Sequence, residues 1–468
     1  MNIKIKKVLK NVSYSFTANI ISMIISVISV TFLPRVMSIE DYGVWQLYLF
    51  YMSYLGFFHF GWLDGICLRY GGCYFENLDK IKFTSQFILL FIIEFIISIL
   101  ALMLINLFIN NYFIKEVLIF VSYILVPIIL FTFTTFILQI TNKIKEYVYL
   151  TLFGRILFFI SLIIYFNLDN RGYVELIYFD IISRILSLFY GIYLIKDILV
   201  FKLDTISNIF KEMWGNISVG SKLLFANIAG MLILGIIRFG ISQQWDVATF
   251  GKVSLTLNCS NFLMVFINAL SIVFFPILKR IDDSKIKDLY IKIRNGLTSI
   301  LLGCLLIYYP LNSILSWWIP KYQDSLIYMA ILLPICLFES KVSLLTNTYL
   351  KALRKEKIMM KINLGVVIVS LVLTYISTVL LHDLNIAVIS ILLLFAIKSI
   401  CSEIVLEKVL EIQIKKDILQ EIILVVLFVS INFSNVNVLV KFIIYTTSFI
   451  LYLYINRKVI RNSFKALK

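Results

Sequence analysis

Apolar segments of roughly 20 residues recur from one end of the 468-residue chain to the other. A helix of about 20 residues is long enough to cross a hydrocarbon core about 30 Å thick, because it rises about 1.5 Å per residue. With 61% hydrophobic and only 15% charged residues, the composition lies far outside the range of soluble domains. The sequence therefore predicts an all-α polytopic membrane protein.

About fourteen membrane-spanning segments are expected. Each is a continuous apolar block without the alternation of barrel strands, which favours helices. The predicted spans are 12–33, 43–65, 84–106, 117–139, 150–168, 173–195, 217–241, 252–278, 296–318, 325–349, 362–381, 385–405, 420–433 and 437–456. Because the links between them are short, no separate soluble domain is expected.

Basic residues are distributed unevenly over these links. One alternate set of links contains only Arg35, Lys115, Arg171, Lys252 and Lys321, whereas most of the 43 Lys and Arg residues lie in the other set. Cytoplasmic links carry the excess of basic residues, so both termini are predicted to be cytoplasmic. The net charge of +16 then indicates a cationic inner rim that faces anionic membrane lipids, and no nucleic-acid partner is expected.

The cysteines and histidines form no pattern typical of metal ligands. The six cysteines include no CxxC pair, and the two histidines, His59 and His382, are isolated. We therefore predict no metal site, no cofactor and no catalytic residue. A catalytic Cys–His pair stays open as an alternative, because residue counts alone do not exclude it.

Two segments that lie six predicted spans apart show a similar order of residues. The segment "PRVMSIEDYGVWQLYLF" follows the first span, and "IRFGISQQWDVATFGKVSLTL" ends the seventh and begins the eighth. An even number of spans between the copies makes both halves start from the same side, as in parallel repeats. We predict two six-helix lobes, 1–200 and 201–410, related by a parallel repeat, followed by two C-terminal helices and a basic tail in 411–468.

Polar side chains gather on one face of three predicted helices, at about 100° per residue. The stripes are Ser15, Asn19, Ser22, Ser26 and Ser29 in the first span, Tyr42, Gln46, Ser53 and Asp64 along the second, and Ser254, Asn258, Asn261 and Asn268 in the eighth. Small polar residues that join packed membrane helices would explain any single stripe. Because the three stripes lie on early helices of the two predicted lobes, we favour a shared hydrophilic cavity.

Four cations within or at the ends of the spans have no acidic residue three or four positions away on their own helix. They are Arg35, Lys222, Arg238 and Lys341, and Asn227 shares a helix face with Arg238. Inserting a charge at the bilayer centre costs roughly 2.5 kcal/mol or more, so such residues often mark a transport path. We expect these cations to receive an anionic guest.

Other charges within the spans have simpler interpretations. Asp180 and Arg184 are spaced as an i,i+4 ion pair, and Lys398 lies close enough to a helix end for its ammonium group to reach the interface. The acids Glu94, Glu339 and Asp64 are candidates for ion coupling, since a carboxyl group can bind and release a proton as access alternates. A neutral, hydrogen-bonded acid inside the bundle is the alternative. Kinks are expected at Pro127, Pro310 and Pro334.

The motifs resemble those of a known family. The segments "FLPRVMSIEDYGVWQLY", "GWLDGICLRYGGCYFENLD" and "QQWDVATFGKVS" through "VFFPILKRI" are similar to the Wzx-type oligosaccharide flippases of bacterial O-antigen and capsule synthesis. That branch belongs to the superfamily of the lipid II flippases and the MATE exporters. The resemblance implies a fourteen-helix, two-lobed transporter of the bacterial cytoplasmic membrane. It would turn undecaprenyl-pyrophosphate-linked repeat units from the inner to the outer leaflet by alternating access coupled to an ion gradient.

The resemblance also suggests which residues form the site. The cationic cavity residues of the family correspond to Arg35, just after Pro34 ends the first helix, and to Arg238. We expect Arg35, Arg238, Lys222 and Lys341 to hold the pyrophosphate, while polar side chains bond glycan hydroxyls. These polar residues are Asn19, Gln46, Asn227, Asn258 and Asn261. Many family members have an acid near the position of Arg238, so the resemblance does not determine the ion-coupling scheme of this chain.

The implied partners are the lipid-linked oligosaccharide, H⁺ or Na⁺, membrane lipids, and the polymerase and chain-length proteins of lipopolysaccharide or capsule synthesis. Two other transport or enzyme functions stay open. A MATE-like drug exporter would present acids and aromatic rings to cationic drugs. A membrane-embedded polysaccharide polymerase or glycosyltransferase would need a large outer loop or a nucleotide-sugar site, and only short outer links are expected here. A passive scaffold is a further alternative.

Overall fold

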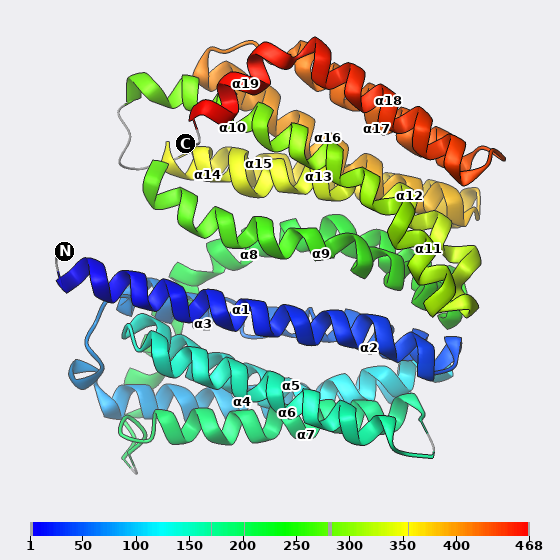
Figure 1. Ribbon diagram of the computed structural model, residues 1–468. Coiled ribbons are helices and arrows are strands. Elements are labelled where there is room, and N and C mark those ends of the chain that lie inside the picture. The colour runs from blue at the N-terminus through cyan, green and yellow to red at the C-terminus, as the bar shows by residue number, and fades with distance from the viewer. Residues whose placement is uncertain (1–2, 170, 201, 279–282, 354, 467–468) are drawn as a thin grey trace. The chain divides into compact units, whose positions relative to one another are not determined.

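The computed structural model describes residues 3–169, 171–200, 202–278, 283–353 and 355–466, and all regular elements in these ranges are helices (Figure 1). The side chains of Ser15 and Asn268 lie outside the described residues. Eleven helices in the described part are long and apolar enough to cross a membrane. The predicted all-α polytopic membrane fold is therefore confirmed, whereas the number of fourteen spans stays a prediction.

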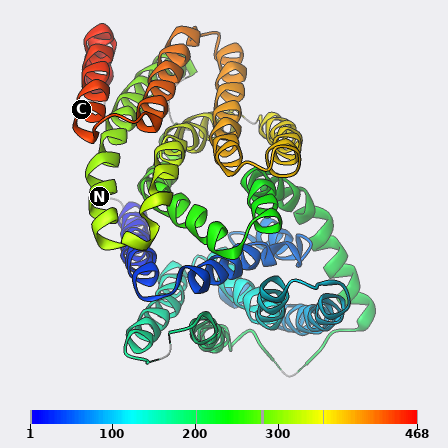
Figure 2. The ribbon, with the colours of Figure 1, turned by 90° about the vertical axis from the view of Figure 1, so that its right-hand side faces the viewer.

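The chain divides into two compact units, Met1–Ile228 and Ala229–Lys468. The boundary falls inside one continuous helix, α8 (Ile206–Gln244), which is longer than the span predicted at 217–241. Helices within each unit run side by side, as the view along their axes shows (Figure 2). The predicted lobes 1–200 and 201–410 and the tail 411–468 stay a prediction.

Unit 1 is built around α5. Besides the first part of α8, its elements are α1 (Ile3–Val36), α2 (Ile39–Met52), η1 (Leu55–Phe57), α3 (Trp62–Tyr70), η2 (Phe75–Asn77), α4 (Lys80–Phe108), α5 (Tyr112–Ile140), α6 (Ile144–Phe166) and α7 (Tyr173–Leu194). Helix α5 packs against α2, α3, α4, α6 and α7, whereas one side of α4 exposes residues such as Phe95 and Met103. Side-chain caps begin α4 and α5: Asp79 accepts from the Lys82 amide and Asn111 accepts from the Ile114 amide.

The second predicted span is not one helix. Helix α2 ends at Met52, and the chain passes through η1 and a turn in which Phe60 and Gly61 have φ angles of 50° and 83° before α3 begins. The polar stripe predicted along 42–64 is therefore wrong, because helical periodicity does not continue across the break. The first helix also differs from expectation: Pro34 lies inside α1, which continues to Val36.

Unit 2 holds the second part of α8 and the remaining helices. They are α9 (Val247–Leu278), α10 (Asp283–Cys304), η3 (Leu305–Ile307), α11 (Tyr308–Trp318), η4 (Pro320–Leu326), α12 (Ile327–Leu332), α13 (Ile335–Ser340), the π-helical η5 (Lys341–Thr346), α14 (Asn347–Ala352), α15 (Glu356–Thr374), the π-helical η6 (Tyr375–Leu380), α16 (Leu384–Leu410), α17 (Lys415–Phe433), α18 (Val438–Ile455) and α19 (Arg457–Ala466). The span Pro320–Ala352 is the core, with 83% of its apolar window buried.

Two of the three predicted proline kinks coincide with changes in helix type. The 3₁₀ turn η3 precedes Pro310, and Pro334 separates α12 from α13. Proline has no amide hydrogen and clashes with the preceding turn, which explains both interruptions. Pro127, in contrast, lies inside α5, which continues as a single α-helix from Tyr112 to Ile140.

Candidate functional site

The polar stripe of α1 is solvent-accessible within unit 1. The side chain of Asn19 is exposed, and those of Ser22, Ser26 and Ser29 are partly exposed. The Ser26 and Ser29 hydroxyls donate to carbonyls one turn earlier, at 2.9 Å and 2.8 Å. The hydrogen-bonding capacity of Ser26 and Ser29 is therefore used within their own helix. Asn19 contributes an exposed side-chain amide to the stripe.

Three further predicted site residues of unit 1 are also exposed. Arg35 lies in the last turn of α1, and Lys222 and Asn227 lie on α8. Gln46 differs, since only 4% of its surface is exposed. The expectation that Gln46 lines a hydrophilic cavity is therefore not met in this conformation.

In unit 2, the structure brings Arg238 to the polar stripe of α9. The Arg238 Nη2 donates to the Ser254 hydroxyl at 3.0 Å, and the guanidinium group lies 5.2 Å from the ring centre of Phe250. Asn258 and Asn261 continue this face one and two turns further along α9, partly exposed and exposed respectively. Arg238, Ser254, Asn258 and Asn261 thus form one polar track, which we call the α8–α9 track.

Lys341 lies elsewhere, in a cluster of four buried charges. Its ammonium group contacts Glu403 at 2.9 Å and also pairs with Glu421, while Arg294 contacts Glu403 at 2.8 Å and Glu421 at 2.7 Å. All four side chains are at most 1% exposed. The two positive and two negative charges balance, and they join α10, η5, α16 and α17.

The expectation that Lys341 lacks a counter-ion is therefore wrong, which removes the reason to expect that it receives phosphate. Its partners lie 62 and 80 residues away in sequence, so the i,i+4 criterion does not detect them. Arg294 and Glu421 were also missed, because both lie near predicted helix ends where charges are common. The acids Glu403 and Glu421 in later predicted spans were the signal that could have suggested partners for Lys341.

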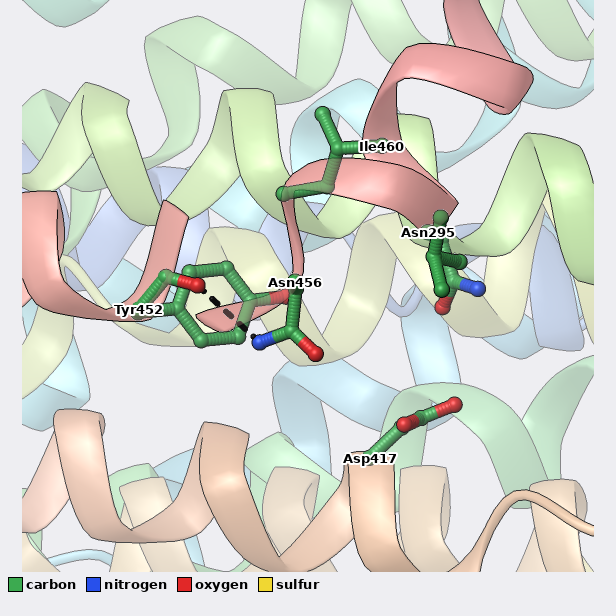
Figure 3. A pocket seen from close by; sticks show the side chains of 6 residues that line it. Asn295, Asp417, Tyr452, Asn456 and Ile460 are labelled. Atoms are coloured by element: carbon green, nitrogen blue, oxygen red, sulfur yellow. Dashed lines mark hydrogen bonds between the residues drawn. The ribbon is translucent and has the colours of Figure 1, made fainter. Parts of the chain in front are cut away.

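A small polar pocket adjoins this cluster (Figure 3). It is lined by Asn295, Asp417, Tyr452, Asn456, Val459 and Ile460. The Asp417 carboxylate lies 3.8 Å from Arg294, and the Asn456 side chain donates to the Tyr452 carbonyl at 3.0 Å. Asp417 lies in the first turn of α17, and Asn456 directly follows the end of α18.

Two other predictions about charges have opposite outcomes. The Asp180–Arg184 ion pair is confirmed at 2.7 Å, and the Tyr48 hydroxyl also donates to Asp180, at 2.8 Å. Lys398 is buried and contacts Glu339 at 2.9 Å, so the expectation that it reaches the interface is wrong. Glu339, a candidate for ion coupling, is therefore neutralised by a lysine of α16.

The remaining ion-coupling candidates are Glu94 and Asp64. Asp64 lies half-buried in the first turn of α3. Glu94 lies in the middle of α4 with 1% of its surface exposed. Neither belongs to the ion pairs formed within the described residues.

Helices α3 and α8 meet at glycines, in a contact that sequence analysis missed. A Cβ atom on Gly65 would lie 1.9 Å from the Asn216 carbonyl oxygen, and one on Gly220 would lie 2.0 Å from the Gly61 carbonyl oxygen. Next to these glycines, Arg69 contacts Glu212 at 2.7 Å and donates to Asn216 at 2.7 Å. Small residues let membrane helices approach closely, and the ion pair fixes their alignment.

Known structures share this arrangement of helices. No protein-family model matches the sequence, and no curated protein matches it. The lipid II flippase MurJ, in an inward closed conformation, superposes with a TM-score of 0.65 and 14% identity over 97% of this chain and 100% of MurJ. An inward-facing multidrug resistance MATE family transporter gives a TM-score of 0.61 and 12% identity over 82% of this chain and 96% of the transporter. The MATE transporter ClbM, in complex with Rb⁺, gives a TM-score of 0.51 and 15% identity over 87% of this chain and 96% of ClbM.

These similarities define the class by fold. The chain is a polytopic membrane protein with the fold shared by the lipid II flippase and the MATE transporters of the MOP superfamily. At 12–15% identity these similarities show the fold only, so the substrate has to be inferred from the chemistry of the site.

Proposed function

We propose that this protein is a flippase of the bacterial cytoplasmic membrane that moves undecaprenyl-pyrophosphate-linked oligosaccharide repeat units from the inner to the outer leaflet. The observation that carries the proposal is the α8–α9 track, in which a guanidinium group lies beside a hydroxyl and two amides. Guanidinium groups bind phosphate oxygens in bidentate geometry, and amides bond sugar hydroxyls. The fold shared with the lipid II flippase over 97% of the chain supports the same substrate class.

The proposed substrate-binding residues differ in two positions from those predicted from the sequence. Arg35, Lys222 and Arg238 are retained as phosphate ligands, and Asn19, Asn227, Asn258 and Asn261 as glycan ligands. Lys341 is omitted because two carboxylates neutralise it, and Gln46 is omitted because it is buried. A drug exporter would require acids facing its cargo, whereas the charged member of the α8–α9 track is an arginine.

The proposal predicts loss of transport when an arginine of the site is removed. Arg35→Ala or Arg238→Ala should abolish assembly of surface polysaccharide and cause lipid-linked oligosaccharide to accumulate on the cytoplasmic face, because one charge-assisted contact to pyrophosphate is lost. Arg171→Ala is the matched control, since Arg171 is exposed and donates to the nearby Leu168 carbonyl.

The measurement is mass spectrometry of lipid-linked oligosaccharides from cells in which the gene is replaced by each variant, with immunoblots of the membrane fraction. Wild-type levels of surface polysaccharide in both arginine variants would exclude the role. A change in drug susceptibility without any change in polysaccharide would favour a MATE-like exporter. The glycan that accumulates in the deletion strain identifies the cargo as O-antigen, capsule or another polymer.

A further inference from the structure

Glu94 differs from the other buried acids of the protein. The buried acids of the described residues are Glu94, Asp180, Glu403 and Glu421. Asp180 pairs with Arg184, and Glu403 and Glu421 pair with Arg294 and Lys341. Glu94 is 1% exposed, belongs to none of the ion pairs formed by described residues, and its Oε2 has no hydrogen-bond partner among them.

The contacts between α4 and α5 locate the carboxyl group. The Ser98 hydroxyl donates to the Ser122 carbonyl at 2.7 Å, and the rings of Phe87 and Phe133 lie 5.3 Å apart. The two helices are therefore antiparallel neighbours with a fixed register. Glu94 lies one turn before Ser98 on the same face, which places it opposite the α5 turn around Val126.

This part of the interface is apolar. Leu90, Leu125 and Ile129 are buried around the Glu94 position. The titratable groups of α5 are Tyr112, Lys115, Glu116 and Tyr123. Only Tyr123 is near in register, and it is 57% exposed, so it points away from the buried face. The charged residues of α4 itself, Lys80 and Lys82, lie at its opposite end from the link to α5 and more than three turns from Glu94.

An ionised carboxylate in such surroundings would lack both a counter-ion and water, which is far costlier than burying the neutral acid. We propose that the α4–α5 interface is a proton-binding site in which Glu94 holds the proton as a carboxylic acid. When water reaches this interface, the carboxyl O–H bond breaks, water takes the proton and the carboxylate remains. The consequence for transport rests on the proposed flippase function: this proton exchange would couple transport to a proton gradient.

The first test addresses the proton itself and needs no transported substrate. Infrared difference spectra of the purified full-length protein at neutral pH should contain the C=O stretching band of a protonated carboxyl group, and Glu94→Gln should lose it. Dicyclohexylcarbodiimide adds across its C=N bond to such an acid, and the adduct rearranges to a stable N-acylurea. Mass spectrometry should find this adduct on Glu94 and not on Glu421, which is paired with cations. An infrared spectrum unchanged by Glu94→Gln would overturn the proposal.

The second test addresses coupling. Proteoliposomes receive undecaprenyl pyrophosphate carrying a fluorescent oligosaccharide as the probe, with and without an imposed pH gradient. The pH gradient should accelerate movement of the probe by the wild type, and this acceleration should be lost in Glu94→Gln. It should be kept in the control variant Glu76→Gln, which removes the charge of an exposed acid. Full gradient dependence in Glu94→Gln would show that the proton has no coupling role. If the wild type moves no probe while the infrared band depends on Glu94, the flippase function fails and the proton site stands.

Discussion

At the scale of single residues, charge neutralisation is the dominant feature of unit 2. Four charged side chains are almost completely shielded from water, so the stability of each charge depends on its ion-pair partners. They are Arg294, Lys341, Glu403 and Glu421. Removing one partner of a buried pair leaves an uncompensated charge, whereas an isosteric neutral replacement of the whole pair is often tolerated. The cluster should therefore respond very differently to single and double substitutions.

Lys341→Met should lower the free energy of unfolding by about 3–5 kcal/mol, because Glu403 and Glu421 lose their shared ammonium partner and one buried negative charge is left uncompensated. The double variant Lys341→Met/Glu421→Gln should recover part of this loss. Unfolding of the purified protein in mixed detergent micelles measures both. Lys292→Met is the control: its pair with Asp288 is exposed, and such pairs contribute about 0–1 kcal/mol. Equal effects of Lys341→Met and Lys292→Met would contradict the buried-charge account.

At the scale of helices, the contact between α3 and α8 is set by backbone rather than by side chains. Gly61 has a φ of +83°, which favours glycine, and it ends the turn that follows the break after α2. Gly65 and Gly220 bring the two backbones so close that no Cβ fits between them. The first part of α8 is thereby fixed to α3, and the ion pair between Arg69 and Glu212 reinforces the contact.

Gly65→Leu should destabilise the protein strongly, because the new side chain would overlap the Asn216 carbonyl and force α3 and α8 apart. We expect a loss of at least about 1–3 kcal/mol, the range for overpacked cores, measured as the fall in melting temperature of the detergent-solubilised protein. Gly56→Ala is the control, since nothing lies within 4 Å of its Cβ position. An unchanged melting temperature in Gly65→Leu would show that the contact is not a packing constraint.

At the scale of the whole molecule, the distribution of basic residues predicts the orientation in the membrane. The exposed Cys73 lies in a link expected to be cytoplasmic, and Arg171 lies in a link expected to face outward. The alternation of these links predicts that both termini are cytoplasmic.

In a variant that retains only Cys73, a membrane-impermeant maleimide should label the protein only after intact cells are permeabilised. In a variant whose single cysteine is Arg171→Cys, the reagent should label intact cells directly. Gel-shift detection of the labelled protein measures both. Labelling of Cys73 in intact cells would reverse the predicted orientation.

The sequence alone determined the membrane class and the approximate helix positions, because the length of an apolar segment is a local property. It also predicted the Asp180–Arg184 pair, whose partners are one helical turn apart. The resemblance to flippases agreed with the fold, although identity to the solved structures is only 12–15%.

The tertiary structure decided which charges meet and where a span breaks. Whether Lys341 is available to phosphate depends on carboxylates 62 and 80 residues away, and the turn at Gly61 that precedes α3 packs against the backbone of α8. Hydropathy measures how strongly side chains avoid water, and it contains no information on ion pairs or on contacts between distant helices. Neutralisation and close packing act between segments that are distant in sequence, so only the folded chain fixes them.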